Sequence, residues 1–119
     1  MGRKYTVEEL TEESRQANLR SLDQMRRYGI KKYEFVCTLS RETCPECGSY
    51  DGQVFDVDDP KVLPPLHASC RCHIASYDSI TVKYYDRFER VYRDPETGKP
   101  GYVKRSMKYT EWAGIFLKD

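Results

Sequence analysis

The chain has few of the residues that fill a large hydrophobic core, and none of the long apolar runs that cross a membrane. Its 119 residues include only one Trp and four Phe, and a third of the residues are charged. No stretch approaches the roughly 20 apolar residues of a transmembrane helix, and the amino-terminal segment lacks the apolar centre of a signal peptide. We therefore expect neither a membrane partner nor secretion.

Recognisable catalytic motifs are also absent. The sequence contains no HExxH, no P-loop and no GxSxG, which are common signatures of metalloproteases, nucleotide-binding enzymes and hydrolases. Asp51 could serve as a catalytic carboxylate, but no histidine or second carboxylate lies at a telling spacing. Because Gly52 follows it, we interpret Asp51 as a turn residue. We expect no enzymatic activity.

Histidine is scarce, but five potential metal ligands lie within 29 residues. They form two close groups, Cys44-Pro-Glu-Cys47 and His67-Ala-Ser-Cys70-Arg-Cys72, with 19 residues between Cys47 and His67. Two close pairs joined by a loop of this length are typical of a structural Zn²⁺ site. We predict that Cys44, Cys47, His67 and Cys70 bind the zinc, with Cys72 in place of His67 as the alternative. Four protein ligands would leave no position for a catalytic water.

The number of cysteines favours metal over disulfides. Five cysteines cannot all pair within one chain, and a chain without a signal peptide is expected in a reducing cytosol. Cys37 lies apart from the ligand groups in the sequence, in a stretch where apolar and polar residues alternate. We therefore predict that Cys37 is a small core residue.

Hydrophobic periodicity and turn residues predict an α+β fold, a small zinc-stapled domain. The first helix should open on a capping box from Thr6 to Glu9 and end before Gly29. We expect one domain over residues 1–119, made of a helix, a zinc core with short strands, and a hairpin with a terminal helix. The predicted ranges are helix 6–28, core 30–77 with strands 32–39, 53–57 and 72–77, hairpin arms 80–93 and 102–105, and helix 108–117.

Basic residues are more frequent in the second half of the chain. Residues 1–60 carry 9 basic and 12 acidic groups, whereas residues 61–119 carry 11 and 7. The chain also has ten Tyr, which suit contact surfaces. We predict that the basic, tyrosine-rich segment 83–108 contacts a partner through Arg90, Lys104 and Arg105.

Several motifs resemble a known family because they occur in the same order at similar distances. They are the run from Gly29 to Leu39, Thr43 to Cys47, Asp51 to Phe55, Pro64 to His67, and Cys70 to Cys72. This series is similar to the Mu F-like minor head proteins of tailed bacteriophages, also described as the phage head morphogenesis family. Phe35 stands where Trp is usual, Ser40 where Asp is usual, and Ala68-Ser69 where Pro-Asn is usual, but no proposed ligand is lost.

The resemblance implies a minor capsid protein that takes part in procapsid assembly near the portal. It implies a phage portal or major capsid protein as the partner, with packaged DNA as a further contact, and a location in the virion and, during assembly, in the host bacterial cytoplasm. Full-length members are usually longer, so we expect a fragment that corresponds to their carboxy-terminal zinc-motif domain. The residues alone leave a second interpretation open, which is a zinc-stabilised nucleic-acid-binding module.

Overall fold

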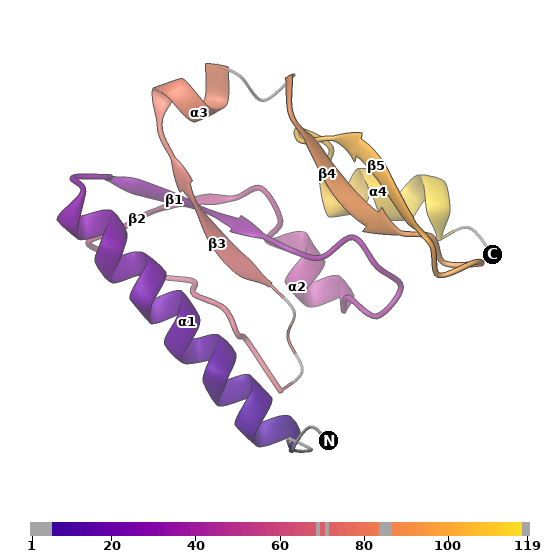
Figure 1. Ribbon diagram of the computed structural model, residues 1–119, viewed down its shortest axis with the longest axis horizontal. Helices are drawn as coiled ribbons and strands as arrows, with labels where there is room; N and C mark the ends of the chain where they lie inside the picture. The colour runs from indigo at the N-terminus through magenta and orange to yellow at the C-terminus, as the bar shows by residue number, and fades with distance from the viewer. Residues whose placement is uncertain (1–5, 69, 71, 84–86, 118–119) are drawn as a thin grey trace.

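The chain folds as the predicted combination of helices and antiparallel strands. The computed structural model describes residues 6–68, 70, 72–83 and 87–117. A long helix lies along a three-stranded sheet, and a two-stranded hairpin with a terminal helix lies on the other side of that sheet (Figure 1). The α+β class is confirmed, whereas the single domain over residues 1–119 stays a prediction.

The first helix, α1, spans Val7–Arg27 and agrees with the predicted range 6–28. Its start is the predicted capping box: the Thr6 hydroxyl accepts the Glu9 N–H at 3.1 Å, and the Glu9 carboxylate accepts the Thr6 N–H at 3.3 Å. Gly29 follows with φ of +75°, a conformation that ends helices. Among the described residues, no helix is both long and apolar enough to cross a membrane.

The central sheet has the order β2-β1-β3, with both pairs antiparallel. Its strands are shorter than predicted, with β1 at Lys32–Val36, β2 at Val54–Asp56 and β3 at His73–Tyr77. Apolar and polar residues alternate in β1, yet both of its faces are buried. Tyr33 packs with α1 residues, whereas the carboxylate of Glu34 is bound by an arginine from the hairpin.

The turn that carries the first two cysteines is a short helix, α2, at Pro45–Ser49. Cys44 is its N-cap residue, and its sulfur accepts the Cys47 N–H. Proline suits the first position of a helix because its missing N–H would be unpaired there in any case. The Cys-Pro-Glu-Cys sequence therefore forms one helical turn with both sulfurs near its beginning.

The predicted hairpin is present, but its first arm is shorter than expected. Strand β4 spans Glu89–Arg93 and pairs with β5 at Pro100–Lys104. Residues 80–83, predicted as strand, instead lie in a short helix, α3, at Ser79–Lys83. All five residues of β5 pair with Glu89–Arg93, so none is left to pair with residues 80–83. Residues 84–86 of the predicted arm lie outside the described residues.

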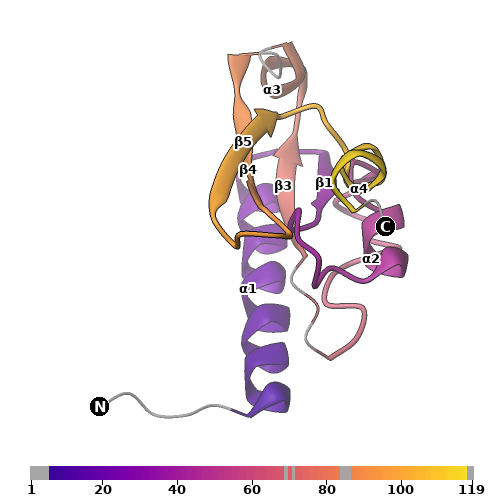
Figure 2. The same ribbon diagram turned by 90° about the vertical axis from the view of Figure 1, so that its right-hand side faces the viewer.

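The terminal helix, α4, spans Tyr109–Phe116, within the predicted range 108–117. It packs on the inner face of the hairpin through Trp112, which is fully buried and contacts the rings of Tyr92 and Phe116. Figure 2 shows α4 beside α2. The hairpin side of the molecule therefore touches the turn that carries the candidate ligands.

Candidate metal centre

Two segments distant in sequence bring the first three candidate ligands together. Cys44 and Cys47 lie at the beginning of α2, and His67 lies in the loop between β2 and β3. The loop is held to α1 because the Asn18 side-chain amide donates to the Pro64 carbonyl at 3.1 Å, and both residues are buried. A buried hydrogen bond thus places the loop just before His67.

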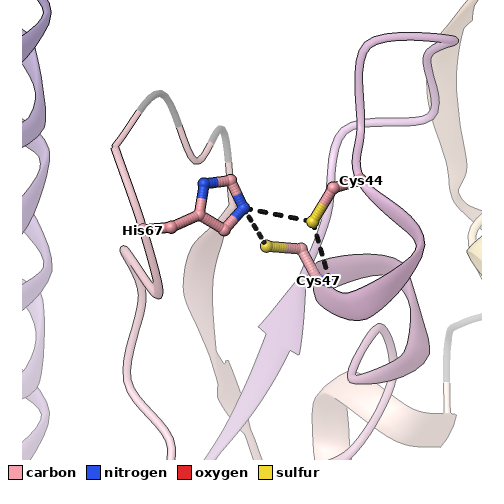
Figure 3. Close-up of side chains that lie close together, drawn as sticks. All are labelled: Cys44, Cys47 and His67. Atoms are coloured by element: carbon pink, nitrogen blue, oxygen red, sulfur yellow. Dashed lines mark hydrogen bonds between the residues drawn. The ribbon is translucent and has the colours of Figure 1, made fainter.

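His67 faces both sulfurs of α2. Its Nε2 lies 3.1 Å from Cys44 Sγ and 3.0 Å from Cys47 Sγ (Figure 3). Its Nδ1 lies 2.7 Å from the Ala68 carbonyl, which can only accept a hydrogen bond. The ring proton therefore sits on Nδ1, and the Nε2 lone pair points towards the sulfurs. A backbone acceptor on the far nitrogen is the usual partner of a metal-binding histidine.

A second group of thiols adjoins the first. Cys47, Cys70 and Cys72 have ligand atoms within 4.8 Å of one another, as do Cys44, Cys47 and His67. Cys47 belongs to both groups, and its sulfur lies 3.6 Å from Cys70 Sγ. All five residues predicted from the sequence are therefore brought together, as two groups that share Cys47.

The thiols of this cluster differ in pKa, and so in how readily each becomes a thiolate. The Cys47 N–H lowers the pKa of the Cys44 thiol, and a hydrogen bond from the Cys72 thiol lowers the pKa of Cys70 to about 5. Burial raises the pKa of Cys47, and the neighbouring Cys44 and Cys70 sulfurs raise it further. A hydrogen bond with Cys37 is the main cause that raises the pKa of Cys72. Crowded sulfurs cannot all ionise together unless a cation offsets their charge.

The separations within each group are close to those between the ligands of a tetrahedral metal ion. Zinc bonds of about 2.3 Å to sulfur and about 2.0–2.1 Å to nitrogen place two sulfurs about 3.8 Å apart and a sulfur and a nitrogen about 3.5 Å apart. The observed separations are 3.6 Å between Cys47 Sγ and Cys70 Sγ, and 3.0 and 3.1 Å from His67 Nε2 to the α2 sulfurs. Cys44, Cys47 and His67 can therefore hold a metal ion after shifts of about half an ångström. Cys70 lies with Cys47 and Cys72 in the second group and would have to move towards His67 to become the fourth ligand.

Cys37 is buried, as predicted for a core residue, but it does not lie apart from the cluster. Its side chain is 1% exposed, and its sulfur lies 2.6 Å from Cys72 Sγ and 2.9 Å from the Cys47 carbonyl. The strand register, and not the local sequence, brings Cys37 to this position.

Asp51 has a larger role than the predicted turn. Gly52, with φ of +85°, does form the turn, but the Asp51 carboxylate is buried and accepts three sets of hydrogen bonds. Its donors are the Cys37 N–H at 2.8 Å, the Tyr109 N–H at 2.7 Å and the Arg90 guanidinium at 2.9 Å. These donors lie 14, 58 and 39 residues away, so no local pattern could have indicated them.

Two of the three charges predicted to contact a partner are bound inside the molecule. The Arg90 side chain is 9% exposed and donates to Asp51, to the Cys37 carbonyl and to the Met107 carbonyl. Arg105 is 17% exposed and donates to the buried Glu34 at 3.0 Å. Only Lys104 is exposed, so the predicted contact through Arg90 and Arg105 is wrong: buried carboxylates bind both guanidiniums.

Comparison with protein families matches residues 4–75 to the family described as Phage Mu protein F like protein. The match covers more than half of the chain and includes all five candidate ligands. No curated protein and no solved structure matches the chain. The family match agrees with the motif resemblance and points to a structural role in phage head morphogenesis. The chain therefore belongs to the Phage Mu protein F like family.

Proposed function

We propose that the protein is a structural component of a tailed-phage or prophage head, acts in procapsid assembly near the portal, and is stabilised by one zinc ion. The family match supports the head assignment. The observation that carries the zinc assignment is the approach of His67 Nε2 to both Cys44 Sγ and Cys47 Sγ within 3.1 Å. The protein would reside in the virion and, during assembly, in the host cytoplasm.

The proposed ligands are Cys44, Cys47, His67 and Cys70. Cys70 is preferred to Cys72 because its sulfur lies 3.6 Å from Cys47 Sγ, whereas the Cys72 sulfur is 2.6 Å from Cys37 Sγ. Thiolate and imidazole donors suit zinc better than magnesium or calcium, which prefer oxygen. With four protein ligands the ion has no open position for water, so we propose a structural metal and no enzymatic turnover.

The outward face of the hairpin is the proposed contact surface for the portal protein. Val91 and Tyr102 are directly opposite each other on β4 and β5, with exposed fractions of 54% and 67%. Their neighbours on this face include Lys104, which is exposed, unlike Arg90 and Arg105. An apolar pair with a polar rim resembles the centre of a protein interface, and the inner face of the hairpin is already covered by α4.

Two matched variants test this surface. Val91 and Leu10 are both 54% exposed, Val91 on the hairpin and Leu10 on α1. We expect Val91→Glu to retain zinc and folding but to reduce portal capture from nuclease-treated lysate and incorporation into heads by at least about tenfold, as loss of an interface-centre contact typically does. Leu10→Glu should leave both unchanged. Normal incorporation of Val91→Glu together with loss for Leu10→Glu would move the interface to α1.

The alternative function, a zinc-stabilised nucleic-acid-binding module, has weaker support because Arg90 and Arg105 are held by Asp51 and Glu34. The two functions differ in their response to salt. Binding to duplex DNA should weaken steeply between about 50 and 200 mM salt if several phosphates are contacted. Tight, salt-sensitive DNA binding without portal capture would favour the alternative.

A further inference from the structure

Cys37 and Cys72 lie one residue beyond the paired ends of β1 and β3. The register of β1 and β3 pairs Phe35 with Ile74 and Val36 with His73, so the next pair along the two chains is Cys37 with Cys72. The two side chains are 1% and 3% exposed. Their sulfurs lie 2.6 Å apart, compared with about 2.05 Å in a disulfide.

The backbone hydrogen bonds of Cys37 show whether Cys37 and Cys72 form a hydrogen-bonded or a non-hydrogen-bonded antiparallel pair. The Cys37 N–H donates to Asp51 and the Cys37 carbonyl accepts from Arg90, so both groups bind partners outside the β3 segment. The pair therefore occupies a position without mutual backbone hydrogen bonds. In antiparallel strands such pairs have their Cα atoms about 4.5 Å apart and their side chains closest. That separation lies within the range of about 4.4–6.8 Å found in disulfides.

We propose that Cys37 and Cys72 form a disulfide when the protein meets a peroxide, and that this modification site is separate from the metal ligands. One thiolate of the pair attacks a peroxide oxygen, the O–O bond breaks, and the leaving hydroxide is protonated to water. The second sulfur then attacks the resulting sulfenic acid and displaces hydroxide, which takes the proton of the second thiol. Two thiols and one hydrogen peroxide thus give one disulfide and two waters.

The disulfide would divide the five cysteines between two tasks. It uses Cys37 and Cys72 and leaves Cys44, Cys47 and Cys70, with His67, for the metal. In this respect alone the inference rests on the proposed zinc site. It also ties β1 to the segment that carries Cys70, which closes a loop of 35 residues. Closing a loop of this size restricts the unfolded chain and should raise the thermal midpoint.

The test uses the full chain, reduced and loaded with zinc, and exposed to a small excess of hydrogen peroxide. We expect a mass loss of about 2 Da, as two hydrogens leave when a disulfide forms, a single linked peptide containing Cys37 and Cys72, and unchanged zinc content. The thermal midpoint should rise by roughly 5–15 °C and return after reduction. Cys37→Ala should not give the linked product and should retain zinc.

The peptide map of the unmutated protein decides the question even if the Cys37→Ala variant does not fold. Recovery of Cys37 as a free, fully alkylatable thiol after oxidation would overturn the proposal. This holds if the other cysteines have formed disulfides with loss of zinc, and also if they have remained reduced. Zinc is measured separately. A Cys37–Cys72 link in protein that never binds zinc would therefore support the disulfide and contradict the metal site.

Discussion

The two sides of this molecule are held together by different chemistry. In the thiol region, the buried cluster contains Phe35 and four cysteines, and we propose that a metal ion stabilises it further. In the hairpin region, made of β4, β5 and α4, the centre is the apolar cluster of Trp112 with Leu39 and Tyr109. If the proposed zinc is bound, a small, polar chain stabilises one region by apolar burial alone and the other by apolar burial and a metal ion.

Asp51 joins the two regions. It accepts hydrogen bonds from Cys37 of the thiol region and from Tyr109 and Arg90 of the hairpin region. A buried carboxylate of this kind is stable only while its donors remain in place. We therefore expect loss of the metal to unfold the thiol region. Loss of the Asp51–Arg90 ion pair should weaken the junction between the two regions.

Removal of the metal should have the largest effect. A structural zinc site contributes an apparent ~10–16 kcal/mol in zinc-finger peptides, compared with a total stability of ~5–15 kcal/mol for an ordinary domain. Because Cys47 belongs to both ligand groups, Cys47→Ala should lose zinc and unfold the thiol region, as followed by circular dichroism and hydrogen exchange. Cys37→Ser is the control, with a cost of about 1–3 kcal/mol and unchanged zinc. An unchanged melting curve after verified chelation would remove the metal from the account.

Breaking the junction should have the next largest effect. Arg90→Ala leaves the Asp51 carboxylate buried without its cation, which typically costs about 3–5 kcal/mol. Arg93→Ala changes an exposed arginine on the same strand and should stay within about 0.5 kcal/mol of the unmutated protein. Urea unfolding of both variants measures the difference. Equal stabilities would show that the Asp51–Arg90 pair does not join the regions.

A smaller effect is expected where α2 meets α4. A Cβ added at Gly48 would lie 2.1 Å from the Tyr109 ring, so Gly48→Ala must displace α4 and should cost about 1–3 kcal/mol. Gly114 lies inside α4 with no atom within 4 Å of such a Cβ. Gly114→Ala should therefore stabilise the helix by about 0.5–1 kcal/mol. A neutral Gly48→Ala would indicate that the two helices pack more loosely than the contact implies.

Local features could be predicted from the sequence because their causes lie within a few residues. The capping box at Thr6 and the stop at Gly29 delimit α1, and the pairing of Cys44 with Cys47 indicated a shared turn. The helix at Ser79–Lys83 was missed because its β-branched residues suit a strand, while the length of β5 decides how many residues can pair.

Long-range features could not be predicted in the same way. The Asp51–Arg90 and Glu34–Arg105 pairs join residues 39 and 71 positions apart, and single charges carry no signal of their partner. The contact of Cys37 with Cys72 follows from the β1–β3 register, which depends on the whole sheet. The spacing of the ligands could suggest a metal site, but not which thiol turns away from it.

The zinc content of the native protein is the decisive measurement for the proposed metal site. The protein should be purified without chelator or added metal, and its zinc measured by elemental analysis against protein concentration from amino-acid analysis. We predict about one zinc per chain, because four donors form one tetrahedral site, with the same value for Cys72→Ser and near zero for His67→Ala. Folded, never-chelated protein with well under half an equivalent of zinc would rule out the proposed site. Zinc lost from Cys72→Ser but kept by His67→Ala would replace the proposed ligand set with the alternative.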